Sequence, residues 1–137
     1  MKVFIVEDSE TVRGHLQTML SHIPGASVVG YAGDELGAIK RIGKLLPDVV
    51  THDLNLKPGS GITVLEYIKK NHPSTKTIVL TNYVDDYYIK ACKDVGADHV
   101  FDKILHFQKV ASVFWKWVND ACTANKVCSA PSTSNRV

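Results

Sequence analysis

The chain alternates short apolar runs with longer segments in which apolar residues recur every three or four positions. The runs occupy residues 3–6, 27–32, 48–52, 77–81 and 99–101. A short continuous apolar run is typical of a strand buried on both faces, whereas the longer spacing is typical of a helix with one apolar stripe. The pattern therefore predicts five strands, each followed by a helix.

The predicted helices can be given apolar stripes and ends. The first two stripes contain Val12, Leu16, Met19, Leu20 and Ile23, and then Leu36, Ile39, Ile42, Leu45 and Leu46. The third contains Ile62, Leu65 and Ile68, the fourth helix covers residues 84–95, and the last, over 105–121, repeats Val110, Val113, Phe114, Trp117 and Val118. Ser9 is a suitable N-terminal cap, Pro47 ends the second helix, and Gly96 suits a left-handed residue after the fourth.

This alternation predicts one α/β domain with a parallel sheet that is covered by helices on both faces. Parallel neighbours need crossover connections, and right-handed crossovers place the helices against the sheet. A ligand site in such a sheet lies beyond the carboxyl ends of the strands. We expect the domain to span residues 1–122 and residues 123–137, which are mostly small and polar, to form a flexible tail.

The composition indicates a globular protein with no dominant charge. The 137 residues are 45% hydrophobic and 22% charged, which excludes a disordered chain and allows one domain core. A formal net charge of +2 gives no reason to expect nucleic acid or a membrane as a partner. No apolar run approaches the roughly 20 residues that cross a bilayer, so we expect a cytoplasmic protein. Cys92, Cys122 and Cys128 form no Cys-x-x-Cys pair and are expected to stay reduced.

Five reactive side chains stand at the predicted strand ends. They are Glu7 and Asp8 after the first strand, Asp53 after the third, Thr81 at the end of the fourth and Lys103 after the fifth. Because the carboxyl ends of parallel strands meet at one edge, these side chains are expected to converge. Converging carboxylates repel one another unless a cation lies between them, and oxygen ligands suit Mg²⁺. Each residue alone has an ordinary explanation, so the prediction rests on their combination.

Four segments, in order, resemble the receiver (CheY-like) domains of two-component response regulators. They read VEDS at 6–9, DLNLKPGSG at 53–61, LTN at 80–82 and GADHVFDK at 96–103. The resemblance extends over residues 2–119 and implies a flavodoxin-like fold with strand order 2-1-3-4-5. The family usually carries a small residue, an aromatic residue and a proline where this chain has Asn82, Val100 and Ile104.

The resemblance implies a Mg²⁺ site and a phosphoryl acceptor. Asp8 and Asp53 would bind the metal through their carboxylates, Glu7 directly or through water, and Asn55 through its backbone carbonyl. Asp53 would be the nucleophile that takes a phosphoryl group from the phosphohistidine of a sensor histidine kinase or phosphotransfer protein.

Two further residues would respond to the new phosphoryl group. By the same resemblance, the Thr81 hydroxyl would donate to one phosphoryl oxygen and Lys103 would pair with another.

His52 precedes the acceptor, but strand alternation points its side chain away from that of Asp53, which favours a structural role.

The same family implies how the switch would be used. A downstream protein would bind the face made by the fourth helix, the fifth strand and the fifth helix, without direct contact to nucleic acid or membrane, and homodimerisation is left open. The domain would catalyse only its own phosphorylation and dephosphorylation. We expect a stand-alone regulator; a phosphate sink, a relay intermediate and a fragment of a longer regulator are the alternatives.

Two functions outside the family begin from similar residues. A Mg²⁺-dependent aspartyl phosphatase also uses an aspartate at a strand end, but it typically has a second acid where this chain has Asn55. A flavin or nucleotide module would offer glycines and hydroxyls after the first strand. Glu7 and Asp8 would repel a phosphate there unless a metal were bound.

Overall fold

The computed structural model describes residues 1–53, 61–82, 86–103 and 107–125, with side chains through residue 120 in the last range. Its strands are β1 (Lys2–Val6), β2 (Ser27–Ala32), β3 (Val49–His52), β4 (Lys76–Thr81) and β5 (His99–Asp102). Its helices are α1 (Glu10–Ser21), α2 (Glu35–Leu45), α3 (Gly61–Asn71), α4 (Asp86–Val95) and α5 (Phe107–Asn125). The predicted alternation of strands and helices is confirmed.

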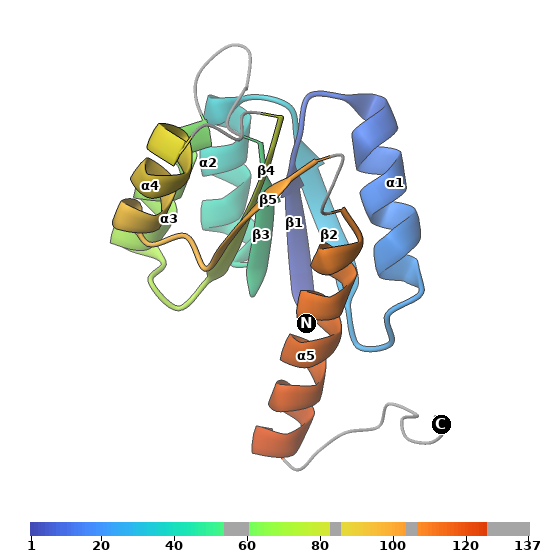
Figure 1. Ribbon diagram of the computed structural model, residues 1–137. Helices are drawn as coiled ribbons and strands as arrows, with labels where there is room; N and C mark the ends of the chain where they lie inside the picture. The colour runs from blue at the N-terminus through green and yellow to red at the C-terminus, as the bar shows by residue number, and fades with distance from the viewer. Residues whose placement is uncertain (54–60, 83–85, 104–106, 126–137) are drawn as a thin grey trace.

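All five strands form one parallel sheet in the order β2-β1-β3-β4-β5 (Figure 1). The predicted fold class and strand order are therefore confirmed. β1, β3 and β4 have a strand on each side, and their residues 3–6, 49–52 and 77–81 are buried throughout. This burial on both faces explains why the sequence shows continuous apolar runs there instead of alternation.

The two faces of the sheet carry separate apolar layers. Val3 and Ile5 of β1 point into a layer shared with α1 and α5, while Phe4 and Val6 point into a layer shared with α2 and α3. α4 joins the second side, where Cys92 packs against Val79 and Leu65. Figure 1 shows the same division, with α1 and α5 on one side and α2, α3 and α4 on the other.

The predicted stripe of α2 is partly wrong. Leu36 and Leu46 remain 78% and 57% exposed, and the buried residues of this helix are Ala38 and Ile42. Leu36 precedes Ala38 by two residues, or roughly 200° of helix rotation, so the two residues point to opposite sides. Leu46 is the C-cap and has left-handed backbone angles, φ 50° and ψ 59°, which take it off the helical stripe.

The predicted start of α1 and end of α4 agree with the structure, whereas the predicted end of α5 is too early. The Ser9 hydroxyl accepts the Val12 N–H at 3.3 Å and caps α1. Gly96 follows α4 with φ 117°, a backbone conformation that strains any residue with a Cβ atom. α5 continues to Asn125, beyond the predicted end at residue 121, and the predicted tail residues 126–137 lie outside the described part. Among the helices described, none has the length and apolar character needed to cross a membrane.

Candidate functional site

The carboxyl ends of the strands bring the sequence-predicted residues together. Val6 of β1 lies beside His52 of β3, and the Asp53 N–H donates to the Val6 carbonyl at 3.1 Å. At the other side of the site, the Lys103 N–H donates to the Thr81 carbonyl at 3.0 Å, which extends the β4–β5 pairing by one step. Residues far apart in the chain are therefore anchored at one edge by backbone hydrogen bonds.

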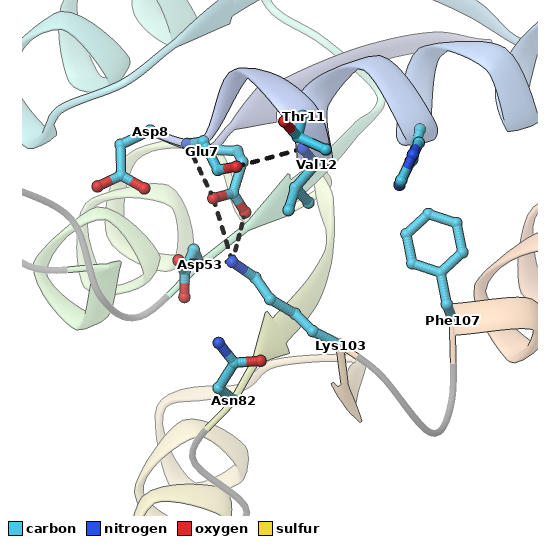
Figure 2. A pocket seen from close by; sticks show the side chains of 10 residues that line it. Glu7, Asp8, Thr11, Val12, Asp53, Asn82, Lys103 and Phe107 are labelled. Carbon is cyan, nitrogen blue, oxygen red and sulfur yellow. Dashed lines mark hydrogen bonds and ion pairs between the residues drawn. The ribbon is translucent and has the colours of Figure 1, made fainter.

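Three carboxylates converge at this edge. Glu7 and Asp53 are only 2% and 4% exposed, whereas Asp8 is exposed at the rim. One oxygen from each lies within 4.8 Å of the others. Figure 2 shows the Asp8 and Asp53 side chains facing the same space beside Glu7. An all-oxygen set of this spacing fits a hard divalent cation such as Mg²⁺.

Lys103 bridges the two buried acids. Its Nζ lies 2.9 Å from Glu7 Oε1 and 2.9 Å from Asp53 Oδ2, and its side chain is 11% exposed (Figure 2). Burial by itself lowers the pKa of Lys103, but the hydrogen bonds and charges of Glu7 and Asp53 outweigh it and raise the pKa above its ordinary value. The lysine therefore stays charged and neutralises part of the acid cluster.

The surroundings of Glu7 oppose its ionisation. Burial raises its pKa, and the charge of Asp53 adds to that rise. The Lys103 ammonium and the Ser9 N–H, which donates to Glu7 Oε2 at 3.2 Å, act in the opposite direction but do not reverse it. One ammonium is thus not enough to offset the cost of ionising the buried Glu7 carboxyl, and a further cation would be stabilised here.

An open pocket gives access to the acids. It has a volume of about 540 Å³ and extends from Asp53 past Lys103 to side chains of α1 and the start of α5. Its lining residues are Glu7, Asp8, Ser9, Thr11, Val12, His15, Asp53, Asn82, Lys103 and Phe107. A small ligand or a side chain of another molecule therefore has room to approach Asp53.

Residues 3–114 match the family model of the response regulator receiver domain. The chain belongs to this family. It is 30% identical over 120 residues to the response regulator protein VraR of Staphylococcus saprophyticus, a match that covers 88% of this chain and 57% of that protein. The chain thus spans little more than half of that relative.

Solved receiver structures are similar to this one. The response regulator domain of CheB from Thermotoga maritima superposes with a TM-score of 0.76 at 27% identity, covering 90% of this chain and 96% of that one. The isolated receiver domain of RcsB from Salmonella enterica, solved in the presence of phosphomimetic BeF₃⁻, has a TM-score of 0.68 at 32% identity, covering 73% of this chain and 75% of that one.

The receiver domain places the remaining predicted residues as follows. Thr81 is buried at the end of β4, and Asn82 is exposed at the pocket. Val100 packs against the small apolar cluster of Leu65, Val79 and Cys92. Asn55 and Ile104 lie outside the described residues. The convergence of the acids and the lysine is established by these positions, whereas the individual chemical roles stay predictions.

Sequence reasoning did not identify Arg13, Thr11, His15 or Phe107 as part of this region. Arg13 Nη1 donates to the Glu7 carbonyl at 2.9 Å, and the other three line the pocket. A signal was present for Arg13, because a long side chain in the first turns of a helix points back toward the helix start, where the acids lie.

His52 lies in the core of the receiver domain beside the acceptor. Its strand neighbours Val6 and Val79 belong to the layers under α2, α3 and α4, so its ring faces that side of the sheet. Within the described part of the chain, neither ring nitrogen has a well-formed hydrogen-bond partner. The pKa of His52 is lowered to about 4, mainly by burial; the Gly61 backbone opposes this shift, and the charge of Lys69 adds to it.

This burial predicts an acid-sensitive stability. The unfolded chain takes up a proton near the usual pKa of 6.5 and the folded chain only near about 4, so the free energy of unfolding falls as the pH drops between these values. Between pH 7 and pH 4.5, the free energy of unfolding should fall in both proteins. We expect the fall to be smaller in His52→Leu than in the wild type by on the order of 2 to 3 kcal/mol. Urea unfolding at both pH values measures this; an equal loss in both proteins would contradict a neutral buried His52.

Proposed function

We propose that this receiver domain accepts a phosphoryl group on the Asp53 carboxylate and signals through the resulting conformational change. The donor is the phosphohistidine of a sensor histidine kinase or phosphotransfer protein. The observation that carries the proposal is the pairing of buried Asp53 with Lys103 beside two further acids at an open pocket. Positioning and charge neutralisation are the main requirements of phosphoryl transfer.

The transfer is a substitution at phosphorus. An Asp53 oxygen forms a bond to phosphorus while the bond between phosphorus and the donor imidazole nitrogen breaks. The bonding electrons remain on that nitrogen, which takes up a proton from water. Asp53 thereby becomes an acyl phosphate, and Lys103, already 2.9 Å from Oδ2, is close enough to pair with a phosphoryl oxygen.

Glu7, Asp8 and Asp53 are the described residues that would hold Mg²⁺, and Asn55 would add its backbone carbonyl. A bound Mg²⁺ would neutralise acid charge and a phosphoryl oxygen, which reduces repulsion between the carboxylate and the incoming phosphate. The structure of the similar receiver domain of RcsB was solved in the presence of phosphomimetic BeF₃⁻. This similarity supports the proposal that the present domain also binds a phosphoryl group.

The signalling step would start at Thr81. Its hydroxyl would donate to the new phosphoryl oxygen and shift the end of β4, and α4, β5 and α5 would present the changed face to a downstream protein. A switch requires such a two-state element, whose balance the phosphoryl group alters. We propose a cytoplasmic regulator that turns over no external substrate.

Intact-mass spectrometry tests the proposed acceptor chemistry. The protein is incubated with Mg²⁺ and acetyl phosphate, and a parallel sample contains excess EDTA. We expect a single phosphoryl adduct with Mg²⁺ and none with EDTA, because the acids repel the donor when no divalent cation is bound. Hydroxylamine should remove the adduct, as expected for an acyl phosphate. An adduct of equal yield in EDTA would contradict the metal-dependent mechanism.

A further inference from the structure

Arg13 connects the acidic segment to the edge of the sheet. Its side chain arises from α1, and Nη1 donates to the backbone carbonyl of Glu7 at 2.9 Å in a partly buried contact. The guanidinium carbon lies 4.4 Å from the centre of the Tyr31 ring, a distance typical of a cation–π contact. Arg13 therefore joins a peptide of the acid site to a side chain of β2.

Tyr31 gives this contact a fixed support. It lies on β2 and pairs in register with Ile5 of β1, two residues before Glu7. The ring is 44% exposed and covers the guanidinium of Arg13 rather than filling the core. A guanidinium on an aromatic face keeps its plane and its donors oriented.

Gly33 lies close to the same peptide. A Cβ atom at this position would lie 3.6 Å from the Asp8 Cα and 3.9 Å from the Glu7 carbonyl oxygen. The Glu7 N–H, in turn, donates to the Ala32 carbonyl at 2.9 Å. The segment that carries both acids is thus held by a backbone hydrogen bond to the end of β2 and by the hydrogen bond from Arg13.

We propose that Arg13 is a positioning residue for Asp8, the exposed acid of the proposed cation site. The carbonyl of Glu7 and the Cα of Asp8 belong to one planar peptide, so holding the oxygen restricts the position of the Asp8 Cα, from which the side chain leaves the backbone. Glu7 and Asp53 are also held by Lys103, whereas Asp8 is at the rim. The inference rests on the proposed function, because it assumes that these acids bind a divalent cation.

Arg13 has two separable effects on a cation at this site. The orientation of the Glu7–Asp8 peptide increases the affinity for Mg²⁺, whereas the positive charge of the guanidinium repels Mg²⁺ and lowers that affinity. Groups that orient metal ligands from outside the ligand set commonly change affinity by about 10- to 100-fold. Because Arg13 holds a backbone group next to the ligand rather than the ligand itself, we expect an effect at the lower end, about tenfold.

Calorimetric titration with Mg²⁺ alone measures the effect without any phosphoryl donor. We expect Arg13→Gln to weaken Mg²⁺ binding by about tenfold even though it removes a positive charge. Arg13→Lys keeps the charge but loses the planar stacked donor, so it should weaken binding as well. Tyr31→Phe should bind as the wild type does, and Tyr31→Thr, a strand-compatible residue without the ring, should be weakened.

Arg41→Gln is the matched control. Arg41 also donates to β2, at the Tyr31 carbonyl, and this hydrogen bond does not involve the acid segment. Wild-type affinity in Arg41→Gln together with weaker binding in Arg13→Gln would support the proposal. Unchanged or tighter binding in Arg13→Gln, full affinity in Arg13→Lys, or equal losses in Arg13→Gln and Arg41→Gln would overturn it.

Two measurements separate this proposal from its alternatives. The unfolding temperature of each variant shows whether the titration was made on folded protein, and the Tyr31 pair tests the same contact if Arg13→Gln does not fold. If the wild type itself binds no Mg²⁺ and forms no adduct, the proposed function fails. If the wild type binds Mg²⁺ and forms the adduct, but the Arg13 variants bind Mg²⁺ as tightly as the wild type does, the positioning role alone fails.

Discussion

Asp53→Asn is expected to abolish the Mg²⁺-dependent phosphoryl adduct. The amide has nearly the size of the carboxylate and can occupy the same buried position, which is 4% exposed in the wild type. It lacks the anionic oxygen that attacks phosphorus, and it also removes one proposed metal ligand. Intact-mass spectrometry after incubation with acetyl phosphate should therefore show the wild-type adduct and only background for the variant.

Two controls show whether the loss belongs to this residue. Asp94→Asn removes a carboxylate that is 66% exposed and paired with Lys90 on α4, so the adduct should form as in the wild type. Asp8→Asn removes a proposed metal ligand but leaves the acceptor, so the adduct should return when Mg²⁺ is raised. An adduct of normal yield on Asp53→Asn would place the acceptor elsewhere, and peptide mapping would then locate it.

Lys103→Met is expected to have the largest effect on stability. The variant keeps much of the aliphatic volume but removes the ammonium that lies 2.9 Å from both Glu7 and Asp53. Removing one partner of a buried ion pair typically costs about 3 to 5 kcal/mol, because the remaining charges are left without compensation. We expect the free energy of unfolding in EDTA at pH 7.5 to fall by about 3 kcal/mol, as measured by urea unfolding.

The same variant should bind Mg²⁺ more tightly than the wild type does. In the wild type, the Lys103 ammonium lies between the two buried carboxylates, so its removal leaves a more negative site for a divalent cation. Added Mg²⁺ should restore much of the lost stability, because a ligand that binds only the folded state stabilises it. Lowering the pH should also reduce the difference in the free energy of unfolding between the wild type and Lys103→Met. The pKa of Glu7 is raised in the folded protein, so the folded chain takes up a proton there more readily than the unfolded chain does.

Lys90→Met is the control, because it removes a lysine from an exposed ion pair instead of a buried one. Lys90 is 76% exposed and lies 3.3 Å from Asp94 one helical turn away. Exposed pairs of this type contribute little, so neither stability nor Mg²⁺ affinity should change appreciably. A similarly small change in Lys103→Met would mean that the buried acids are compensated by something other than the lysine.

The alternation of five strands and five helices could be predicted because it depends on local periodicity. Continuous apolar runs at 3–6 and 77–81 identified strands buried on both faces. Which residues of a helix face the core was less certain. In α2 the small Ala38 is buried while Leu36 is exposed, because the position of the helix against its sheet, not hydrophobicity alone, decides what is covered.

The convergence of the acids and Lys103 could be predicted from the sequence, because each of these residues follows a strand and parallel strands bring their carboxyl ends to one edge. Which of these side chains touch depends on the three-dimensional packing. Lys103 lies 96 residues from Glu7, yet its ammonium bridges Glu7 and Asp53, and Arg13 joins the acid segment to Tyr31. Such contacts depend on angstrom-scale placement of side chains from separate elements, whereas periodicity specifies only the face and the end of each element.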